Sequence, residues 1–375
     1  MKTLFITYHY LNGNGGGVFA SRAYINAFAE LSEDMTLLYP MKEGAEPESI
    51  NPAVKSIPVW DNRSKMQKAL GVFTGRTNRF RNIERFIEDE RFDIVVFDTS
   101  LVVHGIVDSF RKQGAKVVTI HHNYQYEYFR DNVGFPFRLP TLFWSKRFES
   151  EAIRKSDLNL TLTDSDRQLL KKHYGTGKEI IEILGVFEYS HKFHSAYPDV
   201  CEPKFLITGD LGAKQTIVSL TSFLDNYFPL LEELFPGAIL TLAGKNPSPE
   251  LLRLANKYNV QVIPSPGNMS PILASAKYYL CPISLGGGMK LRVMDGLSAG
   301  LPVVCHIVSA RGYEVFIKTG EVLPYHDIAS FREQMVRLQS YSKTKQEAIE
   351  LFEHCFSFES GCGRLSLLLK SHHIV

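Results

Sequence analysis

The sequence predicts an α/β protein in which parallel strands alternate with helices. Short apolar runs recur along the chain, and most are followed by a polar or glycine-rich turn and then by a helical pattern. The 375 residues, 44% of them hydrophobic and 22% charged, suit two globular domains of ordinary size. Each domain is therefore expected to form a doubly wound sheet with its own core.

Composition argues against several classes of protein. A formal net charge of +2 gives no overall field for nucleic acid. No run approaches about 18 apolar residues, the length needed to span a bilayer, and the apolar start is soon broken by polar residues, unlike a signal peptide. The five cysteines have no CxxC spacing, so we expect them to be reduced and to bind no metal. These features predict a cytoplasmic enzyme.

The stretch 281–304, CPISLGGGMKLRVMDGLSAGLPVV, organises the C-terminal half. Its pattern predicts a short strand, a glycine turn, a helix with Leu291, Met294 and Leu297 on one face, and a second strand after Pro302. The turn of such a unit lies at the carboxyl end of its first strand, the edge at which open α/β sheets bind ligands.

This turn has the residues of a phosphate site. Gly286, Gly287 and Gly288 let backbone amides point into one concavity. Lys290, expected in the first turn of the helix, adds a full charge to the partial charge of the helix N-terminus. Asp295 lies five residues further on, about 7.5 Å along a helix axis, which is the reach from a diphosphate to the ribose hydroxyls. We interpret the turn as a nucleoside diphosphate site; the alternative is a tight turn with solvated charges.

The run GGGMKLRVMDGLSAGLPVV resembles the donor-binding motif of glycosyltransferase family 4, which are retaining enzymes of the GT-B fold. Asp295 takes the place of the family's usual glutamate, and Gly287 replaces a second glutamate that many members carry near the donor sugar. The chain is similar instead to the branch with Gly-x-Gly-x-Lys, which implies that Lys290 contacts phosphate.

The resemblance also implies an architecture. Two Rossmann-like domains would face each other across a cleft: an acceptor-side domain over 1–190 and a donor domain over 200–350. The C-terminal helix, about 352–375, would cross back to the first domain. The segment 186–203 is polar and aromatic without clean periodicity, so we interpret it as the linker.

A second glycine-rich turn, Gly13–Gly17, follows the first predicted strand. It is similar to a dinucleotide fingerprint, but Val18 occupies the third glycine position and no acid ends the second strand, so nicotinamide binding is not expected. The resemblance implies that Gly15, Gly16 and Gly17 line the cleft and hold the acceptor or the donor phosphates. The alternative is a plain strand-to-helix turn.

Another predicted strand, 116–120, ends in His121, His122 and Asn123. Polar groups at the end of a parallel strand point towards the ligand crevice, and TIHHNYQYEY resembles the family stretch whose histidine lies close to the reacting sugar. We predict His122 in that role, with His121 in reserve; a structural histidine is the alternative. No further ligands at zinc spacing are visible.

Further donor contacts are implied by the resemblance. The family commonly has a basic residue just after the glycine of the strand that begins at Lys204, where this chain has Asp210. Lys214 fits the position of a second phosphate-binding lysine, and Lys290 is expected to compensate for the missing cation. The base would rest against 244–246 and 263–268. The remaining candidate donor contacts at the strand ends are Gly209, Gly244 and Lys245.

Two stretches of the N-terminal half have unusual surfaces. Asp61–Arg85 is rich in Lys and Arg, which suits anionic lipid head groups, a pyrophosphate-linked acceptor or a solvated helix face. Phe135–Trp144 is rich in aromatic residues and proline, and we expect it to be buried against the sheet rather than to rest on a membrane.

Together these features predict a retaining, metal-independent glycosyltransferase. It would move a sugar from a UDP- or GDP-linked donor to a saccharide or lipid-linked acceptor in cell-surface glycan synthesis. Its location would be cytoplasmic, with peripheral contact at the inner face of a membrane as a further option. No cofactor and no nucleic-acid partner are expected. The alternatives are a non-catalytic sugar-nucleotide binding protein, favoured by Gly287 and Asp210, and a GT-B sugar-nucleotide epimerase.

Overall fold

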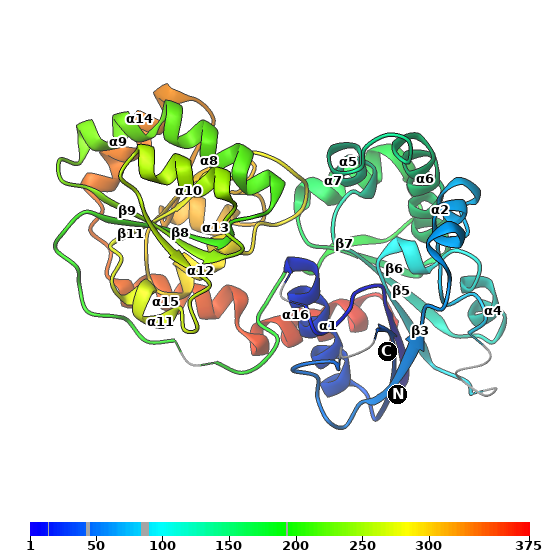
Figure 1. Cartoon of the computed structure of the whole chain (residues 1–375). Coiled ribbons are helices and arrows are strands. Elements are labelled where there is room, and N and C mark those ends of the chain that lie inside the picture. The colour runs from blue at the N-terminus through cyan, green and yellow to red at the C-terminus, as the bar shows by residue number, and fades with distance from the viewer. Residues whose placement is uncertain (14, 43–45, 84–89, 193) are drawn as a thin grey trace. The chain divides into compact units, whose positions relative to one another are not determined.

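The computed structural model describes residues 1–13, 15–42, 46–83, 90–192 and 194–375. The chain separates into two compact units. Unit 1 contains Met1–Lys192 and Cys355–Val375, and unit 2 contains Phe193–His354. Each unit has a single parallel sheet flanked by helices (Figure 1). The predicted α/β class with two doubly wound sheets is therefore confirmed.

The sheet of unit 1 has seven strands in the order β3-β2-β1-β4-β5-β6-β7. Chain order reverses between β1 and β4, so the sheet has a topological switch point there. Thr7 and Asp98, the last residues of β1 and β4, lie side by side in the register. The strands are β1 (Lys2–Thr7), β2 (Asp34–Met41), β3 (Lys55–Trp60), β4 (Ile94–Asp98), β5 (Lys116–His121), β6 (Leu158–Thr161) and β7 (Ile181–Ile183).

Helices cover this sheet because the strands are apolar on both faces. All five residues of β4 are buried, as parallel strands between helix layers require. The helical elements of unit 1, numbered as in Figure 1, are α1 (Gly16–Leu31), α2 (Lys65–Thr74), η1 (Ser100–Val102), α4 (Val107–Lys112), α5 (Gln125–Asn132), α6 (Arg138–Lys155), α7 (Asp164–Tyr174) and α16 (Phe358–Ser371).

The C-terminal helix α16 belongs to unit 1, as the resemblance implied. It packs beside α1 (Figure 1), and the backbone of Gly361 lies directly on the buried ring of Phe187. A Cβ atom at Gly361 would lie 2.0 Å from that ring, so only glycine allows this approach. Arg364 also donates from Nε to the Leu184 carbonyl oxygen at 3.1 Å.

Unit 2 has a six-stranded sheet in the order β10-β9-β8-β11-β12-β13, with its switch point between β8 and β11. Its core joins large apolar side chains from both layers, including Phe205, Phe223 and Phe331. The strands are β8 (Lys204–Asp210), β9 (Ile239–Lys245), β10 (Gln261–Pro264), β11 (Tyr278–Cys281), β12 (Val303–His306) and β13 (Val322–Tyr325).

The helices of unit 2 connect these strands, and α15 continues into unit 1. They are α8 (Lys214–Asn226), α9 (Phe228–Leu234), α10 (Pro249–Lys257), α11 (Ser270–Ala274), α12 (Arg292–Ser298), α13 (Glu314–Thr319), α14 (Ile328–Gln339) and α15 (Lys345–Phe356). Across the described part of the chain, every helix is too short or too polar to cross a bilayer.

The packing of α16 gives a first prediction. Gly361→Ala should lower the free energy of unfolding by about 1–3 kcal/mol, because its methyl group must displace Phe187. Gly363→Ala on the same helix is the matched control, since a Cβ atom there would meet nothing within 4 Å; it should raise stability by about 0.5–1 kcal/mol. Urea titrations followed by far-UV circular dichroism measure both. Equal stabilities would show that α16 does not pack as described.

Candidate functional site

A buried polar cluster lies at the carboxyl ends of three adjacent strands of unit 1. Asp98 ends β4, Thr7 ends β1, and His122 follows β5. The fully buried Asp98 carboxylate accepts three hydrogen bonds: from His122 Nε2 at 2.5 Å, from Ser21 Oγ at 2.5 Å and from Thr7 Oγ1 at 2.6 Å. A buried carboxylate needs such donors because it has left its hydration shell.

The contacts of Asp98 determine the protonation state of its carboxyl group. Burial alone raises the pKa of Asp98, but the charge and the hydrogen bond of His122 outweigh it, so the pKa lies below its ordinary value. Asp98 is therefore ionised at neutral pH, and Nε2 of His122 must be the donor. The other ring nitrogen of His122, Nδ1, is buried and has no hydrogen-bond partner among the described residues. The His122 ring is thus fixed at one nitrogen and open at the other.

His9 completes this cluster, and the sequence analysis missed it. Its ring centroid lies 5.0 Å from that of His122. Burial, followed by the charge of His122, lowers the pKa of His9 to about 4, so His9 is neutral at neutral pH. Its Nε2 atom is buried without a hydrogen-bond partner in the described structure. His9 follows the end of β1 just as His122 follows β5, so the same strand-end signal could have found it.

His121 is held differently. It is the last residue of β5, and its Nε2 atom lies 3.0 Å from Oδ1 of Asn159 on β6. Burial lowers the pKa of His121 to about 4 despite this hydrogen bond. Its ring is bound to β6 and takes no part in the Asp98 cluster, which is the geometry expected of a structural histidine.

The glycines after β1 lie at the start of a helix. Gly16 and Gly17 are the first residues of α1 and Gly15 is its N-cap, whereas the sequence predicted that all three belong to a turn over Gly13–Gly17. A Cβ atom at Gly17 would lie 2.7 Å from the His9 ring, so this glycine makes room for His9. Among the described residues, no side chain caps the N-terminus of α1, which begins beside the histidine cluster.

The predicted donor site of unit 2 starts at the paired ends of β8 and β9. Gly209 lies opposite Gly244 in the register. A Cβ atom at Gly244 would lie 1.8 Å from the Gly209 carbonyl oxygen, and Gly209 has a φ of +124°. Close backbone packing therefore explains the glycine at position 244, and a positive φ explains the glycine at position 209. The strands end in Asp210, whose Oδ1 accepts from Gly212 N at 3.0 Å, and in Lys245.

The glycine loop follows β11, as predicted. Gly286 and Gly288 have φ values of +87° and +67°, which favour glycine. Lys290 Nζ donates to the Gly287 carbonyl oxygen at 2.9 Å. Helix α12 begins only at Arg292, so the expectation that Lys290 lies in its first turn is wrong. With seven residues the helix has few aligned peptide dipoles, and side-chain charge must contribute more of the local positive potential.

Asp295 lies exposed on α12 and is tied to the end of β8. Its Oδ2 atom accepts from Oγ1 of the buried Thr208 at 2.6 Å, and Thr208 shares a hydrogen bond with the hydroxyl of Tyr279 on β11. The carboxylate therefore lies at the switch point between β8 and β11. The 7.5 Å axial estimate does not apply, since Lys290 lies before the helix.

Arg292 is a second residue that the sequence analysis missed. Its Nη2 atom donates to Thr216 Oγ1 at 2.7 Å and to the Asp210 carbonyl oxygen at 3.3 Å. The guanidinium lies on Gly209, where a Cβ atom would come within 2.5 Å of Nε. Its Nη1 atom is buried without a hydrogen-bond partner among the described residues. A cation therefore reaches the tip of β8 from α12, although position 210 itself is acidic.

The remaining predicted residues lie around this edge. Lys214 is the exposed first residue of α8, and the side chain of Gln215, next to it, lies against Gly286. Unit 2 thus brings the glycine loop, Lys290 and Asp295 to one sheet edge, whereas the histidines and Gly15–Gly17 belong to unit 1. In the part of the chain that the structure describes, no three His, Cys, Asp or Glu residues are grouped to hold a metal ion.

Comparisons with known proteins agree with this geometry. Residues 202–340 match the family model described as glycosyl transferases group 1. No curated protein is similar enough in sequence to give a match. Solved structures cover nearly the whole chain. Sucrose-phosphate synthase from Thermosynechococcus elongatus gives a TM-score of 0.70 at 11% identity over 99% of both chains.

Two further structures give the same result. The lipopolysaccharide outer core galactosyltransferase WaaB gives 0.65 at 12% identity over 99% of both chains. An S. aureus TarM mutant, in complex with Fondaparinux, α-GlcNAc-glycerol and UDP, gives 0.70 at 13% identity over 98% of this chain and 99% of that one. The predicted GT-B fold is confirmed, and so is the resemblance to glycosyl transferases group 1 for residues 202–340.

The burial of His121 gives a pH prediction. The unfolded chain protonates this histidine near pH 6.5, while the folded chain does so only near pH 4. Stability present above pH 6.5 is therefore lost as the pH falls towards 4. Relative to His121→Gln, the wild-type protein should lose about 2–3 kcal/mol of unfolding free energy between pH 7 and pH 4. Urea titrations at several pH values test this. Parallel pH profiles would contradict it.

Proposed function

We propose that this protein is a glycosyltransferase that moves a sugar from a nucleoside diphosphate sugar to a saccharide or lipid-linked acceptor, with retention of configuration. The observation that carries the proposal is the glycine loop of unit 2, with Lys290, Arg292 and Asp295 at one switch-point edge. This loop lies inside the residues that match glycosyl transferases group 1. The presence of UDP in the TarM complex supports a UDP-linked donor, and GDP remains the alternative to test.

In this proposal the donor diphosphate binds to cations and amides. Lys290 and Arg292 would neutralise its charge, together with Lys214 at the start of α8. The bare amides at Gly286–Gly288 would donate to phosphate oxygens. Positive charge placed before the reaction stabilises the leaving diphosphate as its charge develops. Asp295 would accept from the ribose hydroxyls, because a carboxylate on the strand edge suits a sugar diol.

The base of the nucleotide would lie beside the ends of β8 and β9. Gly209 and Gly244 let the two strand ends pack closely, and Lys245 is the last residue of β9. Backbone amide and carbonyl groups at 263–268 would read the edge of the base. A base read by backbone groups leaves no side-chain signature in the sequence.

The histidine cluster of unit 1 would position the reacting sugar. Because Nε2 of His122 donates to Asp98, its other ring nitrogen, Nδ1, is left to form a hydrogen bond with a sugar hydroxyl. Asp98 thus acts as a positioning residue through His122. Neutral His9 lies beside it, and the uncapped start of α1 at Gly15–Gly17 would bind polar groups of the acceptor. His121, which forms a hydrogen bond with Asn159, would have a structural role at the end of β5.

The reaction then requires no separate base. The bond from the anomeric carbon to the diphosphate oxygen breaks, and the acceptor oxygen bonds to that carbon on the same face. The acceptor proton passes to the departing phosphate oxygen, so charge and atoms balance. The name of the lipopolysaccharide galactosyltransferase among the similar structures supports a role in cell-surface glycan synthesis.

Two alternatives use the same donor site. A non-catalytic binding protein is favoured by Gly287 and Asp210, which stand where the family has functional side chains. A sugar-nucleotide epimerase would release a changed monosaccharide instead of a glycoside. Slow donor hydrolysis without acceptor separates the binding protein from a transferase, and product analysis by mass spectrometry and NMR identifies an epimerase.

Lys290→Ala tests the donor site. Loss of one charge-assisted contact of about 1.5–3 kcal/mol should weaken nucleotide binding roughly 10- to 100-fold. Asp295→Ala should also lower nucleotide affinity more than it lowers unfolding free energy. Calorimetric titration with UDP and GDP measures the affinities. Lys318→Ala, an exposed lysine on α13, is the control and should bind normally. Wild-type affinity and turnover in Lys290→Ala would remove Lys290 from the site.

His122→Ala tests the role of unit 1. Transfer or donor hydrolysis should fall roughly 100-fold, as for the loss of a group that acts on the reacting sugar. Nucleotide affinity should change less than threefold, because the proposed phosphate contacts all lie in unit 2. Steady-state kinetics and the same calorimetric titration separate the two effects. A variant with full turnover would contradict the proposed position of His122.

A further inference from the structure

An apolar surface on α2 and α6 has no use in the proposed glycosyl transfer. Six large apolar side chains, five on these helices and Phe135 just before α6, are 48–92% exposed. Those on α2 recur at helical spacing, as do Leu139 and Phe143 on α6, so each helix turns an apolar face outwards. We call this set the α2–α6 surface; its members are Met66, Leu70, Phe73, Phe135, Leu139 and Phe143.

The expectation that Phe135–Trp144 is buried against the sheet is therefore wrong for most of the stretch. Phe135 is 92% exposed and Leu139 is 74% exposed. The reason is the helical period of α6, which turns Ser145 and Phe148 inwards and leaves Leu139 and Phe143 on the outer face. Strand burial would have required period-two alternation instead.

Helices α2 and α6 form one surface because they are in direct contact. Trp144 of α6 donates from Nε1 to the Phe73 carbonyl oxygen of α2 at 3.1 Å. The rings of Phe73 and Phe137 lie 5.7 Å apart. Gly75 ends α2 with a φ of +71° and lies against the Trp144 ring, where a Cβ atom would come within 2.5 Å. A residue with a side chain at Gly75 would push the helices apart.

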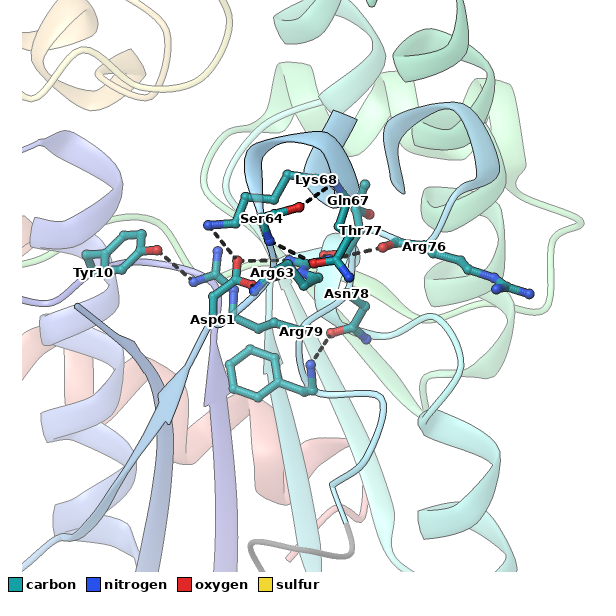
Figure 2. A network of polar contacts seen from close by, with 11 residues as sticks. Tyr10, Asp61, Arg63, Ser64, Gln67, Lys68, Arg76, Thr77, Asn78 and Arg79 are labelled. Atoms are coloured by element: carbon teal, nitrogen blue, oxygen red, sulfur yellow. Dashed lines mark hydrogen bonds and ion pairs between the residues drawn. The ribbon is translucent and has the colours of Figure 1, made fainter. Parts of the chain in front are cut away.

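A polar network holds α2 at both ends, as Figure 2 shows. Arg63 pairs with Asp61 before the helix, with Nε 2.8 Å from Oδ1. Its Nη1 atom also donates to the carbonyl oxygens of Arg76 and Thr77 after the helix, at 3.0 and 3.1 Å. Lys68 adds a contact to Asp61 at 3.5 Å. These contacts hold helix α2 in place with its apolar face exposed. They also pair Asp61, so its charge is already neutralised by Arg63 and Lys68.

The two segments that carry this surface are rich in basic residues. Segments 62–82 and 133–148 contain no Asp or Glu, although the whole chain has nearly equal numbers of acids and bases. Arg85, which the basic stretch also included, lies outside the described residues. The exposed basic residues of the two segments are Lys65, Lys68, Arg76, Arg138, Lys146 and Arg147, and the partly buried ones are Arg63, Arg79 and Arg81.

We propose that the α2–α6 surface docks on an anionic phospholipid bilayer. Phe, Leu and Met side chains would enter the boundary between head groups and acyl chains, and the surrounding Lys and Arg side chains would pair with lipid phosphates. A nucleic acid would use the cations but leave six apolar side chains in water. A second copy of this chain would place like charges against each other, which opposes an isologous contact.

Lipid docking itself does not depend on the proposed glycosyl transfer. Its consequence for the acceptor rests on that proposed function: docking would bring unit 1 to the plane of the lipid head groups, which selects a lipid-linked acceptor over a soluble saccharide. The experiment therefore measures lipid binding without donor or acceptor. A failure to bind lipid would leave the donor site untouched, and a failure of nucleotide binding would leave the surface untouched.

Vesicle sedimentation of the full-length protein tests the proposal. The protein should sediment with vesicles that contain phosphatidylglycerol, bind phosphatidylcholine vesicles at least tenfold more weakly, and dissociate as salt is raised. Equal binding to both vesicles would overturn the anionic lipid assignment. The absence of binding would overturn the proposal, as would self-association that occurs instead of lipid binding.

Matched variants locate the binding on the molecule. Leu139→Glu should reduce vesicle binding at least tenfold, because a charged group replaces an inserted one. Leu367→Glu on α16 is the control, since Leu367 is 68% exposed and lies away from α2 and α6 in the sequence and in contacts. An equal loss in both variants would overturn the assignment to the α2–α6 surface.

A charge pair gives an independent readout. Lys65→Glu combined with Arg138→Glu should lower binding to phosphatidylglycerol vesicles roughly 30-fold or more. Lys171→Glu combined with Lys172→Glu on α7 makes the same change in net charge on exposed residues elsewhere, and should cost less than threefold. Circular dichroism and nucleotide titration show that each variant is folded. Equal losses from the two pairs would show that vesicle binding depends only on the net charge of the protein. That result would overturn the assignment of lipid binding to the α2–α6 surface.

Discussion

The charge of Asp98 is the constraint on which unit 1 depends. A fully buried carboxylate is stable only with donors around it, and those donors come from three separate segments of the chain. Thr7 ends β1, Ser21 belongs to α1, and His122 follows β5. The same carboxylate thus fixes the ends of three neighbouring strands and the first turns of a helix. Any ligand at this edge meets imidazoles that are already oriented.

In unit 2 a partly buried cation lies close to an acidic strand end. The tip of β8 is Asp210, and the proposed donor site requires positive charge at this edge. Arg292 supplies that charge from α12 and rests on Gly209, which lacks a side chain to obstruct it. Thr208 then links Asp295 to the same strand. Because α12 is short, side-chain cations rather than a helix dipole carry the positive potential.

The positive charge of this chain differs in character between the two proposed sites. At the proposed donor site, Arg292 is partly buried and bonded to protein oxygens, which suits recognition of one ligand in one orientation. On the α2–α6 surface, Lys65 and Arg138 are exposed around apolar side chains, which suits a fluid partner without fixed geometry. Neither of these positively charged regions is evident from the formal net charge of +2, because acidic residues elsewhere in the chain balance them.

The sequence by itself determined the α/β class and the glycine loop with Lys290 and Asp295, because periodicity, turn residues and a contiguous motif are local signals. The return of helix α16 to unit 1 was implied by the family resemblance, and the structure shows it. Tertiary structure alone decided that His122 binds Asp98, that the His9 ring lies beside that of His122, and that Arg292 reaches Gly209. Those partners lie 24, 113 and 83 positions apart, and only strand order brings them together. The exposure of Phe135 and Leu139 was likewise decided by packing, because the sequence alone does not distinguish an apolar side chain in a core from one on the surface.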